Sequence, residues 1–199
     1  VILNGRSLKR EDTSIVSLAH VEARRDLGAQ AGHELFGSVT YYRSDQTAVR
    51  TLNLQAYSAQ GGGVYKSQKT QWTGSLLFNH ILLAQSTYLR SRGGSLKLEH
   101  KVTPRLSLFV EGKDVYQDFT PTAVVPLAAQ RSGIEVTGAI GADYRLRPSM
   151  KAGLSYTHGI KHAQRNINAF NRELLSANHI WLLGRGNFLY SYFDFYNDW

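Results

Sequence analysis

The stretch Gly133–Gly159 decides the fold, and it reads GIEVTGAIGADYRLRPSMKAGLSYTHG. From residue 134 to residue 147, apolar or small side chains alternate with polar ones, which places the two kinds on opposite faces of an extended chain. One face carries Ile134, Val136, Gly138, Ile140, Ala142, Tyr144 and Leu146, and the other carries Glu135, Thr137, Ala139, Gly141, Asp143, Arg145 and Arg147. Pro148 ends the run, because proline lacks the N–H that a ladder needs and holds the preceding residue extended. The alternation resumes over 150–157.

The length of these two segments indicates the class of sheet. Strands of soluble proteins usually run about 5–6 residues, whereas membrane-crossing strands need about 9–11. Two long strands joined by a tight turn, apolar on one face and charged on the other, are typical of a barrel with a lipid-facing exterior and a wet interior. A soluble sandwich with its apolar face turned to a core is the alternative. We expect an all-β, transmembrane, antiparallel up-and-down β-barrel of about ten strands (eight to twelve), or a part of a larger barrel.

Composition agrees with this class. The chain has 199 residues, no cysteine, 18 glycines and 11 tyrosines, and its mean hydropathy is −0.30. No apolar run approaches the roughly 18 residues of a membrane helix. The net charge of +8 is compatible with nucleic acid, anionic lipid or an acidic substrate. The basic residues are scattered through strands and turns, so we expect no nucleic-acid partner. No signal peptide is visible at the start.

The rest of the chain is divided by turn-like segments. We expect a periplasmic lead-in over 1–13 and the barrel over 14–199. The glycine-rich segments 27–32, 59–63 and 91–94 and the polar segment 43–46 predict turns, the long stretch 64–90 is split near residues 79–80, and the segments 119–132 and 160–178 predict loops. Counting strands between these breaks gives ten. The count places the turns at Pro104 and Pro148 in the periplasm together with the start of the chain, and the long loops outside.

Two hairpin segments carry a resemblance. At YRLRPSMKAGLSYTHG (144–159) and LEHKVTPRLSLFVEG (98–112) the chain resembles Gram-negative outer-membrane β-barrels, and in particular porin-like barrels associated with surface-polysaccharide export. The terminal Trp199, with Phe193 and Phe195 at matching parity, is similar to the last strand that the barrel-assembly machinery recognises in this class, although Asn197 departs from the pattern. The resemblance implies a bacterial outer-membrane location, with outer-membrane lipid, lipopolysaccharide and envelope export components as partners. It carries no catalytic motif.

Charged residues on the expected inner face are the candidate functional site. They are Lys97, Glu99, Lys101, Glu111, Lys113, Glu135, Asp143, Arg145 and Lys151. In a barrel of this size they nearly fill the interior. We expect them to line a narrow passage for small solutes or surface polysaccharide and to select by charge. The alternative is a salt-bridged plug in a non-conducting barrel that anchors an envelope assembly.

Two chemical hypotheses receive less weight. His158 and His162 have the i, i+4 spacing of a helical metal pair, but they flank a strand end and have no adjacent glutamate. An outer-membrane lipid hydrolase would need a Ser/His pair, but Ser155 and His158 are three residues apart, a spacing that points them to opposite faces of a strand. We therefore expect no cofactor, no metal and no enzymatic activity.

Overall fold

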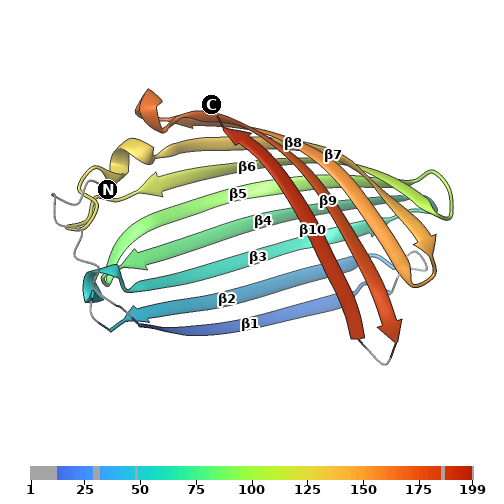
Figure 1. The fold of residues 1–199 in the computed structure, drawn as a ribbon, viewed down its shortest axis with the longest axis horizontal. Helices are drawn as coiled ribbons and strands as arrows, with labels where there is room; N and C mark the ends of the chain where they lie inside the picture. Colours follow the sequence, from blue (N-terminus) through green and yellow to red (C-terminus); the bar gives the residue numbers. More distant parts are fainter. Residues whose placement is uncertain (1–12, 29–31, 48, 185–186, 199) are drawn as a thin grey trace.

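The computed structural model describes residues 13–28, 32–47, 49–184 and 187–198 as a single ten-stranded sheet (Figure 1). The strands are β1 (Ser14–Asp26), β2 (Glu34–Gln46), β3 (Leu54–Lys66), β4 (Thr70–Leu83), β5 (Ser86–Lys101), β6 (Leu106–Phe119), β7 (Gly133–Arg147), β8 (Met150–Ala163), β9 (Phe170–Gly184) and β10 (Asn187–Asp198). Three short 3-10 helices, η1 (Arg50–Leu52), η2 (Ala128–Arg131) and η3 (Asn166–Asn168), lie in connections. Among the described residues, no helix is long and apolar enough to cross a membrane.

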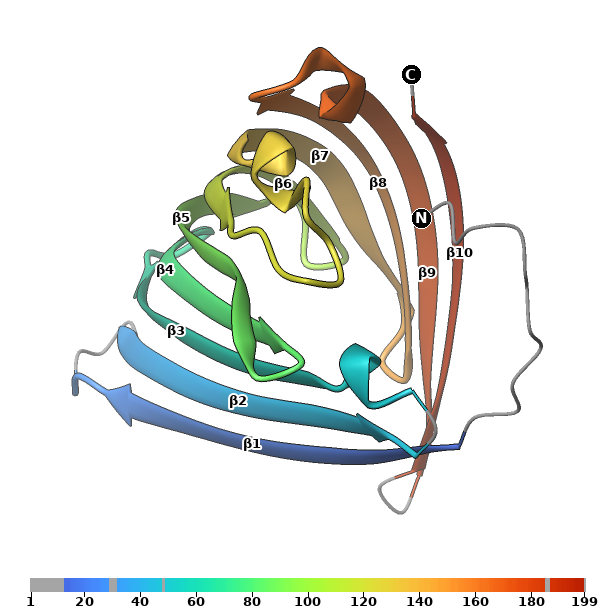
Figure 2. The same ribbon diagram turned by 90° about the vertical axis from the view of Figure 1, so that its left-hand side faces the viewer.

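Each strand pairs antiparallel with its sequence neighbours, in the order β1 to β10. The strands are 12 to 16 residues long, well beyond the usual strand of a soluble protein. The sheet curls around an inner space, with β1 at one end of the arc and β9 and β10 at the other (Figure 2). This is the up-and-down all-β architecture that the sequence predicts.

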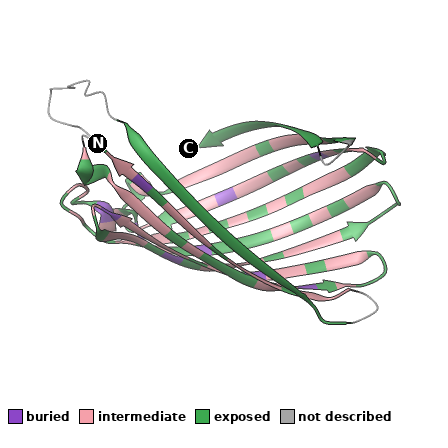
Figure 3. Cartoon of the chain, turned by 90° about the horizontal axis from the view of Figure 1, so that it is seen from below, coloured by how far each residue is buried: buried purple, intermediate pink, exposed green. Residues whose placement is uncertain are grey.

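Exposure alternates along the strands, and the apolar residues are the exposed ones. On β7, Ile134, Val136 and Ile140 are exposed while Glu135 and Thr137 between them are half-buried. Ile140 is 60% exposed. Within the described part of the chain, the only buried apolar residues are Val64, Leu83, Val115 and Ala128. The described residues form no conventional hydrophobic core, and the two end strands β1 and β10 are exposed along their whole length (Figure 3).

Several predicted strand boundaries are wrong. Segments 59–63 and 91–94 are not turns but the interiors of β3 and β5, and β3 continues to Lys66. The split near 79–80 falls inside β4, since the real hairpin turn is at Ala84–Gln85. The predicted loop 160–178 contains the end of β8 and the start of β9, and only 164–169 connects them.

Close approach of the backbone explains the glycines inside β3 and β5. A Cβ on Gly62 would lie 2.2 Å from the carbonyl oxygen of Gly74 and 2.7 Å from the Phe36 ring. A Cβ on Gly93 would lie 2.0 Å from the carbonyl oxygen of Asp114. Glycine inside a strand often marks such a close contact or a bend. Here it lets the long strands curve without ending.

The boundary errors change which end of the sheet the chain starts from. We call the end that carries the turns 67–69, 102–105 and 148–149 the Pro-turn end, and the end that carries 84–85, 120–132 and 164–169 the loop end. Five strands precede the Pro104 turn, so Ser14 begins at the loop end, and Asp198 also finishes there. The prediction that the start of the chain lies at the same end as the proline turns is therefore wrong. The predicted lead-in over 1–13 falls almost entirely outside the described residues.

Candidate functional site

The polar faces of the strands form one continuous concave surface, which we call the inner face. A hollow of about 280 Å³ is lined by side chains from the five consecutive strands β3 to β7, including Ser58, Asn79, Ser91, Lys113 and Thr137. A hollow that spans five neighbouring strands fits the concave side of a curled sheet, although apolar hollows on the outer face also span four strands. The opposite, outer face carries the exposed apolar residues such as Leu76, Leu96 and Leu154.

The nine predicted charges all belong to the inner face. Directly paired residues of neighbouring strands share a face, and the pairs Lys97–Glu111, Ser95–Lys113, Lys113–Thr137, Val115–Glu135 and Arg145–Lys151 connect them. Glu99 pairs with Phe109, Lys101 with Ser107, and Ser107 with Asp143. The register thus gathers the whole predicted set on one surface. Its role in selecting solutes stays a prediction.

The structure brings some of these charges together. The Lys151 Nζ lies 3.0 Å from a carboxylate oxygen of Asp143, and the Asp143 side chain is only 18% exposed. The Lys97 ammonium lies 4.4 Å from the centroid of the Phe109 ring, within cation–π range. Glu135 accepts a hydrogen bond of 3.0 Å from the amide of Gln117. These contacts hold the charges at the wall of the inner face.

Other inner-face residues were not predicted. Lys161 donates a 2.6 Å hydrogen bond to the Gln117 amide oxygen and lies 5.2 Å from the centre of the Phe119 ring. Arg172 forms two hydrogen bonds, of 2.7 and 3.0 Å, with the carboxylate of Asp198. Lys161 and Arg172 lie in the segment predicted as a loop, so their alternation was not used. The parity of β8, continued from Lys151, finds Lys161, but Arg172 has the opposite parity because the 164–169 connection intervenes, so the alternation of β8 does not find it.

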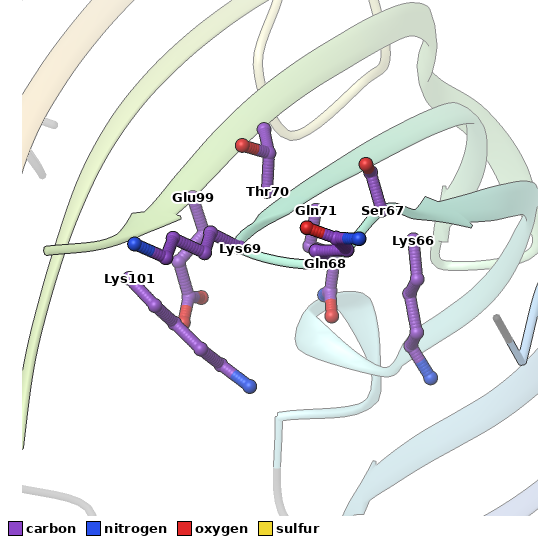
Figure 4. Close-up of a pocket in the computed structure, with 8 residues that line it drawn as sticks. All are labelled: Lys66, Ser67, Gln68, Lys69, Thr70, Gln71, Glu99 and Lys101. Atoms are coloured by element: carbon purple, nitrogen blue, oxygen red, sulfur yellow. The ribbon is translucent and has the colours of Figure 1, made fainter. Parts of the chain in front are cut away.

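A network of charges joins β1, β2 and β3 near the Pro-turn end. Glu34 pairs with Lys66, and its other oxygen lies 3.5 Å from Arg24. Arg24 also forms a 2.5 Å hydrogen bond with Glu22. Lys66 in turn lines a hollow of about 460 Å³ at this end, with Lys69 and Lys101 among the lining residues. Figure 4 shows Lys66 at one side of this hollow and Lys69 and Lys101 at the other.

The outer face carries two aromatic groups separated by an aliphatic band. Trp72, Tyr144 and Trp181 lie toward the Pro-turn end and are 42–43% exposed. Tyr57 and Tyr116 lie toward the loop end and are 42% and 41% exposed. Aromatic girdles at the two interfaces flank the apolar band of membrane barrels. This arrangement matches the polarity of a bilayer.

The geometry does not assemble the two alternative chemical sites. Ser155 pairs with Gly141 and faces inward, whereas His158 pairs with Gly138 and faces outward. His158 and His162 share the outer face, but four residues along a strand separate them by about 13 Å, too far for one metal ion. Among the described residues, no group of three or more metal-ligating side chains is clustered.

Part of the predicted terminal signal lies outside the described residues. Trp199 lies outside the described part of the chain. Phe193 and Phe195 lie on the outer face of β10 and are 65% and 62% exposed. Recognition by the barrel-assembly machinery stays a prediction.

Comparison with known proteins identifies the fold but no family. No protein-family profile matches the chain, and no curated protein does. The β domain of the Bordetella autotransporter BrkA is 13% identical, with a TM-score of 0.51 over 93% of this chain and 85% of that one. The fold is that of a Gram-negative outer-membrane β-barrel. A KdgM porin in complex with disordered oligogalacturonate is 12% identical, with a TM-score of 0.49 over 92% of this chain and 91% of that one.

Proposed function

We propose that the chain is an integral protein of the bacterial outer membrane that gives small solutes or surface polysaccharide a passage along its charged inner face. The observation that carries the proposal is the inverted polarity of the sheet, with apolar side chains exposed and polar ones lining the hollows. Such a surface is stable when lipid covers the outside and water fills the inside. Fixed charges then sort solutes by electrostatic attraction and repulsion, and no covalent chemistry is needed.

A planar lipid bilayer tests this passage. Purified protein should give discrete conductance steps, and the lysines and carboxylates of the inner face should make the ion preference depend on salt concentration. Lys113→Gln should change the reversal potential in a salt gradient, since Lys113 lines the central hollow. Arg90→Gln is the matched control, because the partner residues of Arg90 place it on the outer face. Silence at every voltage, from protein that migrates as a folded barrel before boiling, would refute the passage.

A non-conducting anchor barrel is the second candidate, and the β6–β7 connection favours it. The loop 120–132 folds back at the loop end, where Ser132 accepts a 2.8 Å hydrogen bond from the backbone of Phe119. Asn168 and Arg165 of the next connection both bond Gln130, and Ala128 is completely buried. The two connections are thus tied together at this end of the sheet. Deleting residues 122–129 should raise the conductance if the loop merely constricts a channel, and leave the protein silent if the barrel is an anchor.

We propose that the loop end, with both chain termini, faces the periplasm and the Pro-turn end faces outward. The proposal rests on the last strand, whose resemblance to an assembly signal favours a periplasmic end for the chain, and it departs from the usual rule that the longer loops lie outside. The chain has no cysteine, so single cysteines give a clean readout. Ser67→Cys in the exposed turn 67–69 should react with a membrane-impermeant maleimide on intact cells, and Ala123→Cys should react only after the outer membrane is permeabilised. If Ala123→Cys reacts on intact cells and Ser67→Cys only after permeabilisation, the proposed orientation is wrong and the loop end faces outward.

A further inference from the structure

Two hollows meet at the Pro-turn end. One has a volume of about 460 Å³ and lies beside the β3–β4 turn, and the other has a volume of about 280 Å³ and lies beside the β5–β6 turn. Both are lined by Glu99 and Lys101, so they adjoin. Ligand sites commonly have about 300–1,000 Å³. The combined space is large enough for a small solute at this mouth.

Six cations line these hollows: Lys66, Lys69, Lys101, Arg105, Arg145 and Lys151. Two of them are already neutralised, Lys66 by Glu34 and Lys151 by Asp143 at 3.0 Å. The other four have no described carboxylate within ion-pair distance, and Glu99 is the one carboxylate of the lining not engaged in a described pair. The mouth therefore holds more positive charge than its own residues neutralise.

Hydrogen-bond donors accompany this charge. Gln68 and Gln71 line the first hollow, and Thr103 and Ser107 line the second. Guanidinium groups such as that of Arg145 bind carboxylate or phosphate through paired hydrogen bonds, and lysines add point charges. A neutral sugar could use the hydroxyls and amides alone, but it would leave the four cations unmatched.

We infer that the Pro-turn mouth is a binding site for compact polyvalent anions, that is, solutes with two or more carboxylate or phosphate groups. The inference deepens the proposed passage function and rests on it for its consequence, since an anion held at the mouth enters the passage at a raised local concentration. Binding itself does not depend on conduction. The anion-binding site and the passage can therefore be refuted independently.

Calorimetric titration of the detergent-solubilised protein at low salt tests the site. The probes are citrate and inorganic pyrophosphate, which separate carboxylate from phosphate recognition, with glucose as the neutral probe. Citrate or pyrophosphate should bind, glucose should not, and rising salt should weaken the binding. The double variant Lys101→Gln/Arg145→Gln should bind about tenfold or more weakly, because the loss of even one charge-assisted contact costs about tenfold.

Arg25→Gln is the matched control. Its partner Leu35 places Arg25 on the outer face near the Pro-turn end, so it removes the same charge from the same end without touching the hollows. Binding should be unchanged in this variant. Equal losses in Arg25→Gln and in the mouth variant would show attraction by net charge alone, and would overturn the site, as would wild-type protein that binds neither anion.

Bilayer recordings distinguish this inference from the passage. Anion binding in a protein that never conducts leaves the mouth site standing and refutes the passage. Conductance without any anion binding keeps the passage and refutes the site. When both hold, citrate added on the Pro-turn side should reduce the chloride current, and the double variant should lose that block.

Discussion

The two faces of β7 differ in a way that reverses the rule for soluble proteins. Ile140 lies on the outer face and is 60% exposed. Asp143 lies three residues further along the same strand and points to the inner face, where its side chain is 18% exposed and paired with Lys151. In water, the exposed aliphatic face would be a large apolar patch. The contrast teaches that the surrounding solvent, and not a core, decides which face is stable.

Adding a charge to the outer face should produce the largest loss of stability. Ile140 is the middle residue of β7, so Ile140→Lys should place an ammonium near the centre of the apolar band and cost about 2–4 kcal/mol of unfolding free energy. Denaturant titration of the protein in lipid vesicles measures this. Ala139→Lys is the control, because Ala139 faces inward opposite Glu111. If the protein were soluble, Ile140→Lys would change stability by only about 0.5 kcal/mol.

Adding a methyl group to the inner face should produce the second largest loss of stability. Gly93→Ala would force a Cβ to within 2.0 Å of the Asp114 carbonyl oxygen, and overpacking of this kind costs about 1–3 kcal/mol. Gly112→Ala on the outer face meets nothing within 4 Å and should be nearly neutral. The temperature at which the folded gel band converts to the unfolded one reports both variants. Equal shifts would show that the inner face is no more crowded than the outer.

Removing an inner-face charge should affect stability less than it affects ion preference. Asp143→Asn breaks the pair with Lys151, whose own side chain is 50% exposed, and partly exposed pairs contribute about 0.2–1 kcal/mol. The lost negative charge should nevertheless move the reversal potential toward anions. Ser107→Asn, on the residue paired with Asp143, keeps the charge and serves as the control. A loss above about 2 kcal/mol would assign Asp143 a structural role instead.

The alternation of residues predicts the faces well because it is a local property of each strand. It placed all nine candidate charges on one surface without any knowledge of strand partners. The contacts that these charges make with other side chains cannot be predicted without the register of the strands. Nothing in the sequence alone brings Lys97 over the Phe109 ring or joins Glu135 and Lys161 through Gln117.

Turn prediction failed where the turn residues carry no turn signal. The β4–β5 hairpin turns at Ala84 and Gln85, with φ of 49° and 68°, positions where Asn and Gly are usual. The predicted total of ten strands was right because two errors cancelled. One strand too many was counted before Pro104, where glycines in β5 suggested a turn, and one too few after it, where the basic β8–β9 hairpin suggested a loop. The total was unaffected, but the end of the sheet at which the chain starts was predicted wrongly.

The contrast between the faces breaks down at β1 and β10, where every residue is exposed. Each strand has one edge outside the described ladder, and unpaired backbone groups are costly in lipid. With ten strands, β1 and β10 run antiparallel, so direct pairing would continue the pattern of the sheet. We expect these two edges to join in the membrane.

The register of the sheet fixes how they would join. A line of directly paired residues that starts at Asp26 crosses all ten strands and arrives at Tyr196. A strand tilt of about 40°, with a rise of about 3.3 Å per residue and strands about 4.8 Å apart, requires an offset of about 12 residues on closure. Tyr196 then meets residue 26 − 12 = 14, which is Ser14, and Ala19 meets Ser191 on the outer face.

Disulfide trapping reads this offset directly, with the smallest disturbance of the fold. Ala19→Cys combined with Ser191→Cys should cross-link under mild oxidation, because directly opposed strand residues lie within disulfide reach. Ala19→Cys with Phe193→Cys, or with Leu189→Cys, tests offsets of about 10 and about 14 residues and should cross-link poorly, since a diagonal neighbour is about 7–8 Å away. The chain has no other cysteine to compete. Cross-linking in none of the three would mean that β1 and β10 do not pair, and that further strands complete a larger barrel.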